Sequence, residues 1–339
     1  MKSKSIQLRN SVIATTLAAL GMAYASQASA TAIATSLISI SNFTFTDASG
    51  RPLTYELPGG ATGPAGDIQA ISFTDTLQNN ATLNGVSSFN QASTGAFVAV
   101  TDAAMACVGS TCGSIGENNF VPATPPPTAV YSRSDSILKD QPINVLDGGV
   151  SVGIPIGVDA TTIGETVLMG DAIGSSGSNT QLLSTLQFTL AQDVGSIGIS
   201  FDAVTQLLAW TSLGSAFGTS AGADFKWEIT LKEDTTTLID WIPDGNVLTG
   251  TQTGLNVVKE DCTLSDNASA YENSPLAPIT CSGRFSAFSN VSLLAGKTYS
   301  FNIAQHETTL AQSIPEPASL ALTGLGLLGL GAMRRRKSV

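Results

Sequence analysis

Apolar and β-branched side chains recur at every second position through much of this chain, and this period of two most limits its fold. Successive side chains of a strand point to opposite faces of a sheet, so the alternation predicts strands with one buried face. Turn-forming residues separate the alternating segments. The predicted strands are 37–46, 68–74, 96–100, 182–190, 197–203, 225–231, 238–241, 255–258, 284–294 and 297–303.

Away from the two ends of the chain, no segment shows a sustained period of 3.6 residues, although residues 204–213 fit either a short helix or a buried strand. The middle of the chain is rich in Ser, Thr, Gly, Ala and Asn, which favours strands and turns. We therefore expect an all-β ectodomain over residues 31–311, an antiparallel β-sandwich of jelly-roll type.

Runs of Gly, Pro and Ser predict three loops, at residues 59–66, 113–128 and 170–180. The second contains Pro125, Pro126 and Pro127 and is the candidate hinge if the ectodomain divides near residues 117–130. The part before this hinge lacks a dense apolar core. A single domain with long insertions is therefore the preferred interpretation.

The first thirty residues have the layout of a secretory signal peptide. Lys2, Lys4 and Arg9 precede an uncharged, mostly apolar run, and small residues end in Ala28 and Ala30. We expect a signal helix that engages the Sec translocon and is cleaved by signal peptidase after Ala30. The remaining chain then works outside the cytoplasm.

The other end, residues 312–339, has three parts in order. Pro315, Glu316 and Pro317 precede an uncharged Gly- and Leu-rich run, 318–333, predicted as a helix about 24 Å long, slightly short of a bilayer core of about 30 Å. Basic residues after the run favour the cytoplasmic side. They are Arg334, Arg335, Arg336 and Lys337.

This tripartite tail resembles a PEP-CTERM sorting domain. The resemblance implies an exosortase substrate: a protein inserted transiently in the inner membrane of a Gram-negative bacterium, cleaved near Pro315–Pro317, and released or transferred to the cell surface or extracellular matrix. It also implies an association with exopolysaccharide and biofilm. Residues 308–313 are then expected to link the last strand to the tail. An ordinary single-pass tail anchor is the alternative.

The mature chain is strongly acidic. Of 15 basic residues, three lie in the signal and four in the tail, which leaves eight against 26 acidic residues and a net charge of about −18. Nucleic acid is excluded as a partner, because so few basic side chains cannot replace the phosphate counterions. The charge suits a soluble exported protein that meets cations or neutral polysaccharide.

Four cysteines predict two local disulfides in an oxidising compartment, Cys107 with Cys112 and Cys262 with Cys281. Three pairings are open in principle. Zinc is the competing interpretation, but no Cys-x-x-Cys pair is present and His306, the one histidine, is remote in sequence. We assign no metal ligands.

No catalytic residues are assigned either. His306 would have to serve any Ser-His-Asp triad, and we expect it to be a surface or strand-end histidine. Two carboxylates can hydrolyse a glycoside, but spacing along a strand selects neither Asp224 with Glu228 nor Glu233 with Asp234.

Calcium stays open as a cofactor, since hard cations take oxygen ligands from loops. Candidate oxygens occur in two groups, Asp261, Asp266, Asn267 and Glu272, and Asp240, Asp244 and Asn246, without EF-hand spacing. An exposed Trp210, Trp227 or Trp241 would stack on sugar rings, although such residues are more often core.

The combined expectation is a non-enzymatic exported surface or matrix protein. A calcium-assisted carbohydrate-binding module of jelly-roll type is the first alternative. A glycoside hydrolase is the second.

Overall fold

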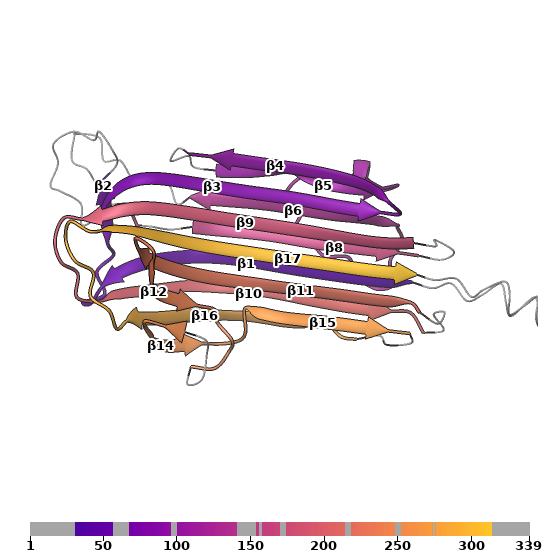
Figure 1. Ribbon diagram of the computed structural model, residues 1–339. Coiled ribbons are helices and arrows are strands. Elements are labelled where there is room, and N and C mark those ends of the chain that lie inside the picture. Colours follow the sequence, from indigo (N-terminus) through magenta and orange to yellow (C-terminus); the bar gives the residue numbers. More distant parts are fainter. Residues whose placement is uncertain are drawn as a thin grey trace, which may run out of the picture.

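The computed structural model describes residues 31–56, 68–95, 100–140, 154–155, 158–169, 174–213, 218–247, 252–272, 274 and 276–313. Within these ranges the chain forms two sheets packed face to face, an almost entirely antiparallel β-sandwich (Figure 1). The described part holds no helix long and apolar enough to cross a membrane. The predicted signal helix and the hydrophobic helix 318–333 lie outside the described residues.

The first sheet has seven strands and is all antiparallel. In spatial order they are β14 (Leu255–Glu260), β16 (Ile279–Ser289), β10 (Ile197–Thr211), β1 (Ala32–Asp47), β8 (Val158–Leu168), β6 (Tyr131–Asp140) and β5 (Val100–Gly109).

The second sheet has ten strands and one parallel pair, β2 with β3. Its main path is β13 (Gln252–Thr253), β12 (Thr236–Trp241), β11 (Ser220–Glu233), β17 (Thr298–Ser313), β9 (Gly174–Leu190), β3 (Ile68–Leu83), β2 (Thr54–Glu56) and β7 (Ile154–Pro155). Off this path, β15 (Ser265–Tyr271) pairs with β11 and β4 (Val86–Thr94) pairs with β3. A short 3-10 turn, η1 (Cys112–Ser114), follows β5.

Strand β17 is the last strand of the chain and a central strand of the ten-stranded sheet. It pairs with β9 along its whole length and with β11 over nearly all of it. Residues 308–313, expected to be a linker, instead form the last part of this strand, and His306 lies within it rather than at a strand end. The fold therefore continues to the residue at which the tail begins.

Both ends of the described domain lie at the same end of the sandwich. Ala32, which opens β1, pairs with Leu168, the last residue of β8. Ser313, which closes β17, pairs with Gly174, the first residue of the next strand, β9. The chain enters and leaves the fold side by side.

At the other end of the sandwich the interior is aromatic. Phe201 stacks on Phe285 with ring centroids 4.9 Å apart and lies 4.4 Å from Trp227, while Phe45 meets Phe301 edge to face at 4.6 Å. All of these side chains are buried. Such packing removes large apolar areas from water, which is the main favourable term in folding.

Towards the end where β17 stops, the interior is made of small polar side chains. Ser132 of β6 donates a hydrogen bond to the carbonyl of Gly177 in β9 at 2.7 Å, so the two sheets are joined directly. Thr166 and Thr309 join β8 to β17 through their hydroxyls at 2.9 Å. A Cβ on Gly164 would lie 2.7 Å from the Ser178 hydroxyl, so a larger residue would displace this hydroxyl.

This polar interior explains where the sequence prediction of strands was wrong. Residues 174–180 were expected in a loop but are the first part of β9, with Ser176, Ser178 and Thr180 buried between the sheets. Strand β6 carries polar residues on both faces and was not among the predicted strands, and neither was β8. The mostly exposed strands β4 and β15 were missed for a different reason, because they bury few apolar side chains. Residues 204–211 continue β10 as a buried strand, one of the two conformations expected there.

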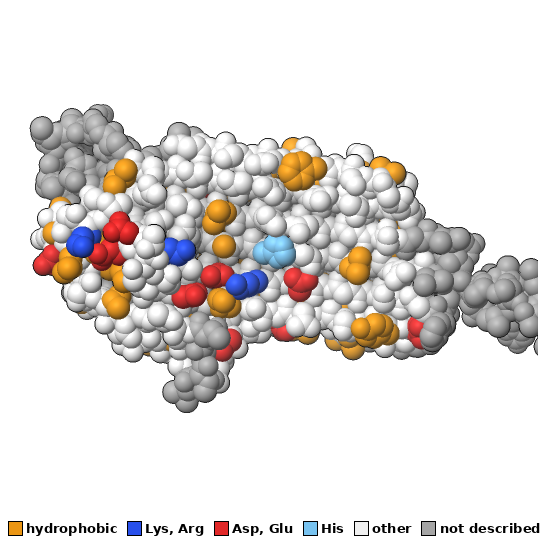
Figure 2. All heavy atoms as spheres, in the orientation of Figure 1, with side chains coloured by type: hydrophobic (Ala, Val, Ile, Leu, Met, Phe, Trp, Pro, Cys, Tyr) orange, Lys and Arg blue, Asp and Glu red, His pale blue; other side chains and the backbone are white. Residues whose placement is uncertain are grey.

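Figure 2 shows the molecule in the same orientation as Figure 1, with the ten-stranded sheet in front. Apolar side chains are scattered singly over this face, and charged ones are few. Isolated apolar side chains are normal on a protein surface, so the described residues of this face form no apolar docking patch.

Glu307, on the inward side of β17, predicts a stability that depends on pH. The side chain is 0 % exposed, and burial raises the pKa of its carboxyl well above the ordinary value of 4.5. Above pH 4.5 the unfolded chain releases this proton while the folded chain keeps it, so folding loses stability as the pH rises. The slope from this group approaches about 1.4 kcal/mol per pH unit.

Glu307→Gln removes this titration and should stabilise the protein at pH 7 relative to the native chain, with little difference at pH 4. Free energies of unfolding from urea titrations at both pH values measure the effect. Glu228→Gln, on the outer side of β11, is the matched control for loss of a carboxylate outside the interior. A difference for Glu307→Gln that is the same at both pH values would contradict the assignment.

Candidate functional site

Residues 110–130, named here the covering segment, lie against the outer face of the seven-stranded sheet. Ile115, Ala123 and Ala129 of this segment pack with Ile33, Tyr131, Val167 and Leu208 of the sheet. The segment joins β5 to β6 and holds one cis peptide bond, between Pro125 and Pro126. The expected loop is therefore present, but it covers a sheet rather than separating two subdomains.

Disulfides close one end of the covering segment and a second surface loop. Cys107 is paired with Cys112 and Cys262 with Cys281, which is the pairing expected from the sequence. The first disulfide links the end of β5 to η1. It therefore limits where the covering segment can start.

A buried ion pair holds the middle of the covering segment. Arg133 of β6 is 2 % exposed and donates to Glu165 of β8, which is 0 % exposed, at 2.8 Å. The other Arg133 nitrogens donate to the carbonyls of Asn119 and Val121 at 2.6 and 2.7 Å. The guanidinium thus binds the covering segment and the sheet together.

Both carboxylate oxygens of Glu165 also accept hydrogen bonds. The Tyr131 hydroxyl donates to its Oε2 at 2.6 Å, and the backbone N–H of Ala123 donates to its Oε1 at 2.5 Å. Thr35 of β1 donates to Oε1 at 3.3 Å. A buried charge pair is stable only when such additional hydrogen bonds complete it, so the pair depends on the covering segment staying in place.

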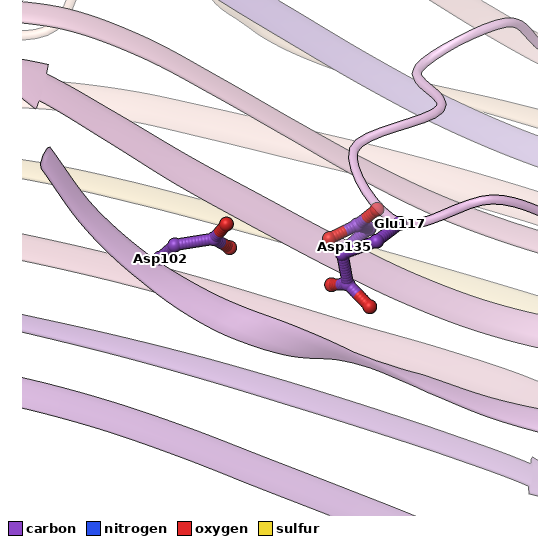
Figure 3. Close-up of side chains that lie close together, drawn as sticks. All are labelled: Asp102, Glu117 and Asp135. Atoms are coloured by element: carbon purple, nitrogen blue, oxygen red, sulfur yellow. The ribbon is translucent and has the colours of Figure 1, made fainter.

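Beside this ion pair, three carboxylates form an acidic cluster of Asp102, Glu117 and Asp135. One carboxylate oxygen of each lies within 4.8 Å of the others. Asp102 belongs to edge strand β5, Asp135 to β6 and Glu117 to the covering segment. In Figure 3, Asp102 points toward Glu117 and Asp135, whose side chains overlap in this view.

Backbone pairing brings two of these residues together. Strands β5 and β6 pair in antiparallel register on either side of a bulge between Ala103 and Ala106. Asn79 in the interior donates to the carbonyls of Ala103 and Ala104, which holds this bulge from the inner side. Bulges of this kind re-aim side chains at a sheet edge.

Hydrogen bonds then fix the cluster. Asn118, at φ 58°, donates from its backbone N–H to Asp135 Oδ2 and from its side chain to Asp102 Oδ2, both at 2.8 Å. The N–H of Met105 donates to Glu117 Oε1 at 2.5 Å. Each carboxylate has one oxygen engaged by a donor.

Asp135 is the exceptional member of the cluster. It is 0 % exposed, and its Oδ1 has no hydrogen-bond partner. Burial first, and then the negative charge of Glu117, raise the pKa of this carboxyl from 3.8 to about 7. A strongly perturbed, buried carboxyl beside two exposed ones marks a candidate functional site.

The oxygen ligands considered from the sequence do not assemble in this way. Asp261 accepts from the backbone of Arg284 and pairs with Lys259, Glu272 accepts from the backbone of Gly218, and Asp244 accepts from the backbone of Asn246. Among the described residues, the group of carboxylates close enough to share an ion is the acidic cluster. The acidic cluster was not among the oxygen groups considered from the sequence.

The paired carboxylates considered for glycoside hydrolysis also have structural partners. Glu228 pairs with Lys226 and Glu233 with Lys297 on the surface of the ten-stranded sheet, and Asp224 accepts from Thr308. His306 lies 3.4 Å from the side chain of Asn179 across the β17–β9 pairing.

The tryptophans offer little sugar-stacking surface. Trp227 and Trp241 are 0 % exposed, and the indole N–H of Trp241 donates to Glu260 at 2.6 Å. Trp210 is half-buried and packs beside the covering segment.

A shallow hollow lies near the turn after β1. Asp47, Arg51, Leu53, Asp193 and Val194 line it. The Asp47 carboxylate accepts hydrogen bonds from Ser49 and Arg51, with the Ser49 hydroxyl first among the causes that lower its pKa to about 2. Residues of the same turn therefore donate hydrogen bonds to both oxygens of the Asp47 carboxylate.

Sequence reasoning missed the acidic cluster, because its members are distant in sequence and follow no known motif. The one local signal is Glu117 followed by Asn118 in a loop, next to a polar strand that carries Asp135. This signal does not specify the register in which β5 pairs with β6.

Comparison with known proteins identifies one segment. A family model for the PEP-CTERM protein-sorting motif matches residues 313–337. No curated protein matches the chain. Among solved structures, the infectious bursal disease virus VP2 subviral particle is matched at 10 % identity over 86 % of this chain and 81 % of the viral chain. The TM-score is 0.11, far below the value at which two folds correspond.

Glu165→Gln tests the buried ion pair. The substitution leaves the Arg133 charge buried without its counter-charge, and we expect a loss of about 3–5 kcal/mol in the free energy of unfolding. Glu233→Gln breaks the Lys297 pair, whose side chains are 50 % and 26 % exposed, and should cost far less. Urea unfolding measures both, and equal, small losses would contradict the role given to Arg133 and Glu165.

Proposed function

We propose that this chain, which carries a PEP-CTERM sorting motif and is thereby marked as an exported, exosortase-sorted protein, is a non-enzymatic surface or matrix protein that associates with exopolysaccharide in the biofilm of a Gram-negative host. The observation that carries this proposal is the place of the motif. The match begins at Ser313, the last residue of β17.

Cleavage just beyond β17 is compatible with an intact fold. The proposed processing residues, Pro315, Glu316 and Pro317, follow the strand directly in sequence. Removing everything after them leaves both neighbours of β17 paired along the strand. The released product then keeps the whole sandwich.

The arrangement of the two ends supports a tethered intermediate. The signal peptide leads the chain through the Sec translocon and is removed after Ala30, close to the start of β1 at Ala32. The run 318–333 then holds the other end in the inner membrane until the exosortase acts. Since β1 begins and β17 ends at the same end of the sandwich, the opposite end faces away from the membrane.

The side chains support a binding or structural role over catalysis. A glycosidase needs an acid and a second carboxylate that both reach the substrate. In the acidic cluster, the carboxyl with the raised pKa, Asp135, is 0 % exposed beneath Asn118 and cannot reach a sugar.

Calcium-assisted carbohydrate binding is the second candidate function. The acidic cluster favours it, because two of its carboxylates are exposed on the outer side of the sandwich. The repeated passage of the chain from one sheet to the other, as from β8 to β9 to β10, supports a jelly-roll-like classification.

Intact mass of the protein recovered from its exporting host, with and without the exosortase, tests the proposal. We expect a product that begins after Ala30 in both strains and that ends near Pro315–Pro317 only when the exosortase is present. Removal of the signal peptide is the internal control for export. A tail that keeps Arg334, Arg335 and Arg336 in both strains would contradict processing.

Association with exopolysaccharide is measured on the same strains. The processed protein should sediment with isolated exopolysaccharide and remain soluble after the polysaccharide is digested. Equal recovery in the soluble fraction with and without the polysaccharide would contradict the matrix role.

A further inference from the structure

We propose that Asp102, Glu117 and Asp135 bind one calcium ion, with the side-chain oxygen of Asn118 as a further ligand, and that this ion fastens the covering segment to the seven-stranded sheet. The inference is independent of the sorting tail. It concerns residues of β5, β6 and the segment between them.

The separation of the carboxylates fits one calcium ion. Calcium–oxygen distances are about 2.3–2.6 Å, so two ligands on opposite sides of the ion lie about 4.6–5.2 Å apart. The three carboxylates each offer an oxygen within 4.8 Å of the others, so they are close enough together to bind one calcium ion. Magnesium binds at about 2.0–2.1 Å in near-ideal octahedral geometry, and the cluster suits it less well.

The buried carboxylate supplies the independent observation. Asp135 is 0 % exposed and lies in the cluster, and its Oδ1 has no donor within hydrogen-bond distance. The side-chain oxygen of Asn118 is also buried and has no hydrogen-bond partner. Buried polar atoms are normally paired, so these two unpaired oxygens, on residues that also contact one another, are suited to bind a cation.

The negative charge of the acidic cluster also favours a bound cation. Three carboxylates lie together, and their donors are all neutral: the backbone N–H groups of Asn118, Met105 and Ser136 and the side-chain amide of Asn118. The neighbouring cation Arg133 is bound to Glu165 and to two carbonyls.

A bound ion would complete the attachment of the covering segment. The disulfide at Cys107–Cys112 fixes its start, the acidic cluster fixes residues 117–118, and Arg133 with Glu165 fixes residues 119–123. Calcium would link Glu117 and Asn118 directly to β5 and β6. A ligand that binds only the folded chain raises its thermal stability as its concentration rises.

The test uses the exported protein from its host, treated with a chelator and then dialysed. Calorimetric titration with calcium chloride should show one equivalent bound, with magnesium chloride at least tenfold weaker. The midpoint of thermal unfolding should rise with calcium concentration.

Asp135→Asn separates binding from folding. The amide is similar in shape and uncharged, so this variant should melt above the native protein in chelator, because an unpaired buried carboxyl has been removed. It should lose at least tenfold in calcium affinity and show no calcium-dependent shift in melting. Asp102→Asn, at an exposed position, should weaken calcium binding as well and provides a second variant should Asp135→Asn fail to fold.

Asp234→Asn is the matched control, since it removes one exposed carboxylate at the β11–β12 turn, away from the cluster. It should bind calcium as the native protein does. Absence of calcium binding by the native protein at millimolar concentration would overturn the proposal. Calcium binding that survives both Asp135→Asn and Asp102→Asn would overturn it too, by placing the ion elsewhere.

Discussion

The central position of β17 is the constraint on which the rest of the structure depends. This strand pairs on both sides, with β9 and β11, and its inward side chains pass from Tyr299 and Phe301 in the aromatic interior to Thr309 in the polar interior. The ten-stranded sheet is therefore incomplete until the last residues before the tail have been exported. The sorting motif follows this strand directly, since its match begins at Ser313.

The two halves of the interior are stabilised by different kinds of interaction. Aromatic packing around Phe201 contributes through apolar burial, which tolerates imperfect geometry better than buried polar pairs do. In the polar half, hydroxyl pairs such as Thr166 with Thr309 require a fixed spacing between the sheets. On the outer face of the seven-stranded sheet, the covering segment supplies hydrogen-bond partners to Arg133 and Glu165, and these bonds also require a fixed position of the segment on the sheet.

Predictability from sequence follows this division. In the aromatic half, apolar residues alternate with polar residues along the sequence. β1, β11 and the start of β17 were therefore correctly predicted as strands, although the predicted ranges are shorter than the observed strands. Strands β6 and the first part of β9 bury serine and threonine, so a pattern based on apolar residues found no strand there. The sorting tail was predictable because it is a contiguous motif, now matched at residues 313–337. The acidic cluster was not, since it depends on strand register and on the bulge at Ala103.

Hydrogen exchange of the exported protein, followed by mass spectrometry of its peptides, tests the position of β17 most directly. If β17 is central to the ten-stranded sheet up to Ser313, amides of residues 304–313 exchange as slowly as those of β9 and β11, through global unfolding. Exchange of residues 304–313 at the rate of an exposed loop, with β9 and β11 still protected, would contradict this account. That result would return these residues to the role of a linker.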